Sequence, residues 1–192
     1  YWEWPHKGEG SHSYEENDYG TITVNFANTT YDWDNMIAKP DASSTQSQQN
    51  AVAILTYHCG VSVNMNYSPQ GSGAYPSDIE YALETYFDYD TLLHDAYKEY
   101  YSEAEWKSLL KTELDAARPV LYSGWDVNHA GHCFICDGYD ENDFFHFNWG
   151  WGGYCDGYFA IGILNPGTGG TGSGSGVYNE NNYILVGVEP NI

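Results

Sequence analysis

The spacing of apolar residues changes at Pro119, and this change constrains the fold more than any other feature of the chain. Before Pro119, apolar residues recur at the three- and four-residue intervals of helices. After it they form short runs rich in β-branched and aromatic residues, which are typical of strands. Proline cannot continue a helix, so we expect the transition at this residue. Helices followed by strands indicate an α+β fold with an antiparallel sheet.

Three helices are expected before the transition. The first is apolar, starts after cap candidates in Ser43–Gln49, and ends with Gly60 as its C′ residue. The other two begin at capping boxes, which are Ser77 with Glu80 and Ser102 with Glu105. The expected strands are Thr21–Phe26, Val120–Trp125, His132–Tyr139, Phe144–Trp151, Tyr158–Leu164 and Tyr183–Val188.

Length and charge limit the class of protein. A chain of 192 residues fits one globular domain, and we expect residues 1–192 to form it. The 27 acidic residues far exceed the 6 basic ones, for a formal net charge of −21. Such a surface repels phosphate groups, which argues against nucleic acids and anionic membrane surfaces as partners. No apolar run in the sequence is long enough to span a bilayer.

Two neighbouring strands carry the residues that suggest chemistry. His132 begins one strand directly after Gly131, and Asn148 and Trp149 stand at the end of the next. If these strands pair, the Asn148 amide can reach a ring nitrogen of His132, and Trp149 can cover that bond. Cysteine peptidases orient their histidine in this way. Each motif alone also fits a structural histidine and an aromatic turn.

Several further motifs follow one another in an order that is more specific than any one of them. They are Gly60–Tyr67 with the Ser/Gly loop after it, Trp106, Gly131–Gly138, His146–Gly153, Asp156–Phe159, and Leu164–Pro166 before a glycine-rich stretch. This order resembles the streptopain family of secreted, papain-like cysteine peptidases, from about Tyr1 to the C-terminus. The resemblance implies a papain-like fold, with helices packed on a twisted antiparallel sheet.

The resemblance also implies site residues and partners. His132 would be the catalytic base, Asn148 its orienting partner, and Trp149 the shield over their hydrogen bond. The residues that would line the cleft and offer backbone groups to an extended peptide are Gly131, Ser72 and Gly73. The stretch Asn165–Gly176 would be a mobile edge of the cleft. The family implies protein or peptide substrates, a propeptide or propeptide-like inhibitor as partner, and no cofactor.

The nucleophile is the main departure from the family pattern. The family's cysteine lies in a Gly-Cys-Val-Ala-like stretch upstream of the position matching Tyr1, so we expect it outside these residues. Cys133 points to the opposite face of the strand from His132, and Cys136 lies roughly 13 Å along it. Cys59 fits a small apolar residue, and Cys155 follows the Trp-Gly loop. The spacing of Cys133 and Cys136 within a strand does not fit a zinc site, and no metal is expected.

Two other functions remain open from the sequence. The chain could be a catalytically inactive family member, or a fragment, that acts as a binding or haemagglutinin-like module. It could also be an acidic, aromatic-rich secreted domain that binds carbohydrate. The second alternative would not require His132, Asn148 and Trp149 in this order.

Overall fold

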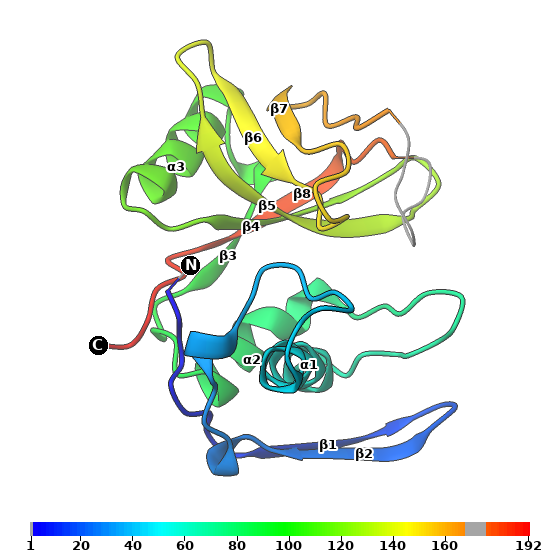
Figure 1. Ribbon diagram of the computed structural model, residues 1–192. Helices are drawn as coiled ribbons and strands as arrows, with labels where there is room; N and C mark the ends of the chain where they lie inside the picture. Colours follow the sequence, from blue (N-terminus) through cyan, green and yellow to red (C-terminus); the bar gives the residue numbers. More distant parts are fainter. Residues whose placement is uncertain (1, 168–175) are drawn as a thin grey trace. The chain divides into compact units, whose positions relative to one another are not determined.

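The computed structural model describes residues 2–167 and 176–192, and the chain divides into two compact units (Figure 1). The first unit comprises Tyr1–Thr91 with Pro190–Ile192, and the second comprises Leu92–Glu189. Most of the expected mobile stretch Asn165–Gly176 lies outside the described residues. No helix in the described part of the chain is long and apolar enough to cross a membrane. One papain-like domain over residues 1–192 stays a prediction.

The first unit combines a β-hairpin with two helices. Its elements are β1 (Ser11–Glu16), β2 (Gly20–Asn25), α1 (Gln46–Ser62) and α2 (Ile79–Tyr86), with the 3-10 turns Phe26–Asn28, Trp33–Asn35 and Pro76–Asp78. The two strands pair antiparallel, and α1 contacts both the hairpin and α2. Phe26 stacks on Tyr86 at 4.6 Å between ring centroids, in the core of this unit.

The first two helices differ from the sequence prediction at one end each. Helix α1 does not end before Gly60 but continues through it to Ser62, and Gly60 lacks a side chain where the hydroxyl of Tyr67 occupies the space that a Cβ would need. Ser77 does not cap α2, since it lies inside the 3-10 turn that Pro76 begins, and Asp78 takes the N-cap position without a side-chain cap. The start of α1 is capped by Thr45, within the predicted segment.

The described residues of the second unit form a six-stranded antiparallel sheet with one α-helix. Its elements are β3 (His94–Tyr97), α3 (Glu103–Asp115), β4 (Val120–Trp125), β5 (Gly131–Tyr139), β6 (Phe144–Asn148), β7 (Gly157–Ala160) and β8 (Glu180–Val186), with the 3-10 turn Lys98–Tyr100 before α3. The strand order is β3-β8-β4-β5-β6-β7. The capping box of Ser102 and Glu105 is present at the start of α3. The predicted α+β fold with an antiparallel sheet is confirmed.

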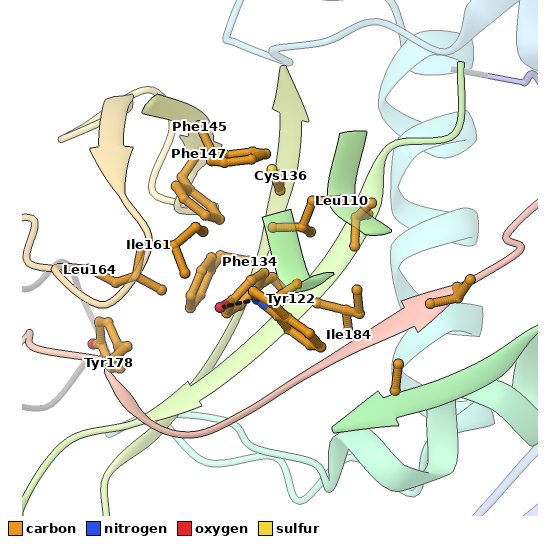
Figure 2. Close-up of a cluster of buried hydrophobic side chains, with 14 of the residues drawn as sticks. Leu110, Tyr122, Phe134, Cys136, Phe145, Phe147, Ile161, Leu164, Tyr178 and Ile184 are labelled. Atoms are coloured by element: carbon orange, nitrogen blue, oxygen red, sulfur yellow. Dashed lines mark hydrogen bonds between the residues drawn. The ribbon is translucent and has the colours of Figure 1, made fainter. Parts of the chain in front are cut away.

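Aromatic side chains fill the core of the second unit (Figure 2). Tyr122 on β4 and Phe134 on β5 are direct partners in the ladder, and their rings stack at 5.3 Å. The indole of Trp106 on α3 donates a hydrogen bond of 3.2 Å to the Tyr122 hydroxyl, which gives both polar groups a partner inside the core. Phe147 on β6 packs edge-on against both stacked rings. These contacts join α3 to the three strands that surround the site described below.

Strands β6 and β7 both end earlier than the sequence predicts. The strand predicted as Phe144–Trp151 stops at Asn148, and the one predicted as Tyr158–Leu164 stops at Ala160. Glycines with positive φ follow both ends, at Gly150 with 76° and Gly162 with 87°, where the chain leaves the extended conformation. The acidic run after Tyr139 forms the β5–β6 turn, as predicted, with Asp140 accepting from the backbone N–H groups of Asn142 and Phe144.

A buried carboxylate links α3 to the end of β8. Glu113 is 3% exposed and accepts two hydrogen bonds of 2.8 Å from Arg118 and one of 2.8 Å from the Gly187 N–H. Burial acts to raise the pKa of Glu113, but the hydrogen bonds from Arg118 and Gly187 outweigh it and keep that pKa below its usual range. Arg118 also pairs with Glu189 at 3.2 Å.

Replacing Arg118 by alanine should therefore destabilise the second unit strongly. The change leaves the Glu113 charge buried without its main partner, which costs about 3–5 kcal/mol of unfolding free energy. Urea unfolding measures this value. Lys107→Ala is the matched control, since it removes a surface pair with the exposed Glu103 on the same helix and should change little. Equal effects of the two substitutions would contradict the structural role of Arg118.

His58 should make the stability of the first unit sensitive to acid. Its imidazole is 8% exposed, contacts Phe26 edge-on, and hydrogen-bonds the Tyr31 hydroxyl at 3.0 Å through Nδ1. Burial lowers the pKa of His58 below its ordinary value of about 6.5. The unfolded chain then binds the proton more readily, so stability present above about pH 6.5 is lost as the pH falls through the folded pKa.

The measurement is the free energy of unfolding between pH 7.5 and 5. We expect it to fall with pH in the parent chain and to fall less steeply in His58→Gln, which keeps a polar side chain but does not titrate. Identical slopes for the two chains would show that His58 does not cause the effect.

Candidate functional site

His132 is the second residue of β5 and follows a tight turn that ends at Ala130. The carboxylate of Asp126 accepts hydrogen bonds of 2.8 and 2.9 Å from the N–H groups of Asn128 and Ala130, and the Asp126 N–H donates to the Ala130 carbonyl. This turn joins β4 to β5 and leaves Gly131 opposite Trp125. A Cβ at Gly131 would approach the Trp125 indole at 3.0 Å, so glycine fits this close contact. His132 is thus held at the end of the sheet by a structured turn.

The imidazole of His132 is oriented by a main-chain carbonyl. Its Nε2 lies 2.8 Å from the carbonyl oxygen of Trp149. A carbonyl oxygen can only accept, so Nε2 carries the proton, and Nδ1 is the basic nitrogen of the neutral ring. Burial lowers the pKa of His132 below its ordinary value, and the hydrogen bond to the Trp149 carbonyl opposes that shift in part.

Aromatic rings surround this hydrogen bond. The Trp151 ring lies nearly parallel to the imidazole at 5.0 Å between centroids, and the Tyr178 ring lies at 5.3 Å. Trp149 is fully buried, and its indole is also nearly parallel to the imidazole but farther away, at 6.5 Å. The structure therefore places Trp149 beside His132 as the sequence suggested, but Trp151 lies closer. The sequence signal for Trp151 was its position two residues after Trp149 in the same Trp-Gly motif.

Asn148 occupies a different position from the one inferred from the sequence. Strands β5 and β6 do pair, but Asn148 lies opposite Ile135, three residues along β5 from His132. The Asn148 side-chain oxygen accepts a hydrogen bond of 2.9 Å from the Gly150 N–H. The direct partner of the His132 ring is therefore the Trp149 carbonyl rather than the Asn148 amide, since β6 ends at Asn148 and the chain turns at Gly150.

The loop between β6 and β7 holds a second carboxylate that the sequence did not single out. Asp156 accepts a hydrogen bond of 2.9 Å from the Trp149 N–H, which closes the loop across its base. Inside the loop, Gly152 and Gly153 have positive φ values of 65° and 91°, which glycine adopts without strain. The Asp-Gly pair after the Trp-Gly motif was part of the family resemblance, but nothing in the sequence indicates its hydrogen bond.

The other predicted cleft residues, Ser72 and Gly73, belong to the first unit. They end an exposed loop whose base is a two-residue antiparallel bridge between Asn66 and Gly73. The Gly73 N–H donates to the Asn66 carbonyl at 3.1 Å, and the Asn66 N–H donates to the Gly73 carbonyl at 2.9 Å. The Gly73 N–H is thus used inside the loop, whereas Ser72 is exposed beside an aromatic pocket formed with Tyr19 and Tyr57.

Cys133 and Cys136 do not have the environment of an activated thiolate. Burial raises the pKa of Cys133 to about 11 and that of Cys136 to about 12, so both are thiols at neutral pH. Cys136 is fully buried in the core, two residues beyond Phe134 on β5. Among the residues that the structure describes, no group of three or more His, Cys, Asp or Glu side chains could hold a metal ion.

Comparison with known proteins shows the family of this chain. The model of the peptidase C10 family matches residues 1–159. The chain is 36% identical over 193 residues to the thiol protease/hemagglutinin PrtT of Porphyromonas gingivalis, and 33% identical over 197 residues to streptopain of Streptococcus pyogenes. These alignments cover 99% of this chain but only 22% of the first relative and 49% of the second.

Solved structures give the same result for the fold. The active wild-type interpain A cysteine protease of Prevotella intermedia superposes with a TM-score of 0.84 at 36% identity, over 97% of this chain and 77% of that one. A prointerpain A fragment from the same organism gives a TM-score of 0.78 at 36% identity, over 97% and 58% of the two chains. The predicted papain-like fold is confirmed by these matches. From its sequence and its fold together, we conclude that this chain belongs to the peptidase C10 family of cysteine peptidases.

Proposed function

We propose that this chain supplies the histidine of the active site of a secreted cysteine endopeptidase, and that the nucleophilic cysteine lies outside these 192 residues. The observation that carries the proposal is the 2.8 Å hydrogen bond from His132 Nε2 to the Trp149 carbonyl. It fixes the tautomer in which Nδ1 is free to take a proton from a thiol. Secretion and endopeptidase activity rest on the family resemblance.

The chemistry assigned to His132 begins with a proton transfer. Nδ1 removes the proton from the cysteine thiol, and the thiolate attacks the carbonyl carbon of the scissile peptide bond. The imidazolium then gives its Nδ1 proton to the leaving amine nitrogen as the C–N bond breaks, which leaves a thioester. Water, deprotonated by Nδ1, hydrolyses the thioester and restores the thiol. Throughout, Nε2 keeps its proton and its bond to Trp149.

The aromatic surroundings fit this role. Trp151 and Tyr178 pack against the imidazole, and Trp149 lies beyond the hydrogen bond in the core. Excluding water strengthens the electrostatic interaction between a thiolate and an imidazolium. Of the three residues to which the resemblance assigned catalytic roles, His132 would act directly, Trp149 would act through its carbonyl and its indole, and Asn148 would act only indirectly.

Protein or peptide chains are the proposed substrates. Gly131 is exposed next to His132 and has no side chain of its own, so its backbone is a candidate contact for a substrate. Ser72 is retained as a candidate contact, whereas the Gly73 N–H is already paired with Asn66. A propeptide or a propeptide-like inhibitor is a proposed partner, because one similar structure is that of a prointerpain fragment.

Replacing His132 by alanine tests the proposed role. In a protein that includes the nucleophilic segment, hydrolysis of a peptide substrate should fall at least roughly a thousandfold, because both thiol activation and protonation of the leaving amine are lost. The measurement is kcat/KM. His146→Ala is the matched control, since His146 lies on the adjacent strand β6 and is paired with Asp137. Full activity in His132→Ala, together with retained folding, would refute the assignment.

Alkylation by an epoxide inhibitor tests where the nucleophile lies. Such inhibitors modify cysteine thiolates that are activated by a histidine. Residues 1–192 alone should gain no inhibitor mass, since Cys133 and Cys136 are thiols at neutral pH, whereas the protein with the nucleophilic segment should gain one. Intact mass measurement of the denatured protein reports the result. Stoichiometric labelling of any of the four cysteines in residues 1–192 would overturn the proposal.

A further inference from the structure

Two side chains hold the backbone on either side of the carbonyl that orients His132. Asp156 accepts the N–H of Trp149 at 2.9 Å, and Asn148 accepts the N–H of Gly150 at 2.9 Å. We propose that Asp156 and Asn148 are positioning residues that together fix the Trp149 carbonyl at the place where His132 Nε2 needs it. This proposal rests on the proposed role of His132 as the base of the peptidase.

The argument follows from peptide geometry. The direction of the Trp149 carbonyl depends on the two peptide planes that meet at the Trp149 Cα, because each plane is rigid and only the two dihedral angles between them are soft. Asp156 binds the N–H of the first plane. Asn148 binds the N–H of the second plane, and His132 binds the carbonyl of that same plane. Both planes are therefore held, and the carbonyl cannot rotate away from the imidazole without breaking one of these bonds.

The loop needs such restraint because its sequence is flexible. Strand β6 ends at Asn148, so the ladder with β5 no longer fixes the chain at Trp149 and Gly150. Gly150, Gly152 and Gly153 all adopt positive φ, and glycine has more alternative conformations than any other residue. Burial of the Trp149 indole anchors the side chain, but it does not by itself choose the direction of the carbonyl. The two side-chain acceptors, Asp156 and Asn148, fix the direction of the Trp149 carbonyl.

Polarisation adds to positioning. In the peptide group between Trp149 and Gly150, the N–H donates to Asn148 while the carbonyl accepts from His132. A peptide group that donates on one side becomes a better acceptor on the other, because hydrogen bonds in a chain polarise one another. The carboxylate of Asp156 makes a charge-assisted bond to the adjacent peptide group. The Trp149 carbonyl thereby keeps its hydrogen bond to His132 Nε2 whether the imidazole is neutral or protonated.

The test compares alanine with isosteric substitutions in the active protein that carries its nucleophilic segment. Asp156→Ala removes the acceptor for the Trp149 N–H, and Asp156→Asn keeps an oxygen there. We expect Asp156→Ala to lower kcat roughly ten- to a hundredfold with little change in KM, because a misplaced base slows chemistry more than binding. Asp156→Asn should lose no more than about threefold. Asn148→Ala and Asn148→Asp should show the same order of effects.

Asp140→Ala is the matched control. Asp140 also accepts two backbone N–H groups, but it does so at the β5–β6 turn, at the other end of β6 from Trp149. Its loss should affect stability without selectively lowering kcat. Nitrogen-15 NMR of the His132 ring supplies a readout that does not depend on turnover. In the parent protein the Nε2 proton should exchange slowly with solvent, and in Asp156→Ala that exchange should accelerate at least tenfold.

The outcomes separate this inference from the proposed function. If His132→Ala is inactive while Asp156→Ala behaves like Asp140→Ala in both kcat and Nε2 proton exchange, the positioning role is wrong and the role of His132 stands. If His132→Ala is active, the proposed function itself fails. If Asp156→Asn is as impaired as Asp156→Ala, an acceptor for the Trp149 N–H is not what the reaction needs, and the inference is overturned.

Discussion

Antiparallel pairing of β5 with β4 and β6 is the interaction on which the second unit depends. The pairs Tyr122 with Phe134 and Cys136 with Phe147 place large side chains on one face of the sheet, where they meet Trp106 of α3. A shift of one residue in this register would turn Phe134 out of the core. It would also turn His132 to the opposite face, away from the Trp149 carbonyl. Core packing and site geometry are therefore fixed by the same register.

Local signals in the sequence predicted the parts of the fold that local interactions decide. The capping box at Ser102, the end of α3 before Pro119 and the bounds of β4 follow from short-range patterns, and the structure agrees with them. Local signals failed at two helix ends. Gly60 is a good C′ residue by itself but lies inside α1, and Ser77 lies in the 3-10 turn that Pro76 begins rather than at the N-cap of α2. The strands β1 and β3 lacked a clear alternating pattern and were not predicted.

In the candidate site too, the sequence predicts some features and not others. The sequence singled out His132 and Trp149, and β5, which carries His132, does pair with β6, which ends just before Trp149. It did not identify the atom that contacts the imidazole, because β6 ends one residue before Trp149 and the chain then turns. A carboxamide and a neighbouring main-chain carbonyl both present an oxygen to a histidine, and motif spacing cannot distinguish between them. The hydrogen bond of Asp156 was not predicted for a related reason, since it depends on the path of the loop from Trp149 to Gly157.

A main-chain carbonyl as the partner of a histidine has a consequence for how such a site can be controlled. A carboxamide partner can be removed by one substitution, whereas every residue at position 149 would keep its carbonyl. The orientation of the imidazole then depends on the side chains that hold the peptide groups, here Asp156 and Asn148.

The Trp149 carbonyl is also neutral, so it orients the ring of His132 without strongly favouring the imidazolium. Burial lowers the pKa of His132, and a nearby thiolate would raise it. A base governed by these two opposing effects holds its proton while the thiolate is present, and it releases that proton to the leaving amine once the thiolate charge has been consumed.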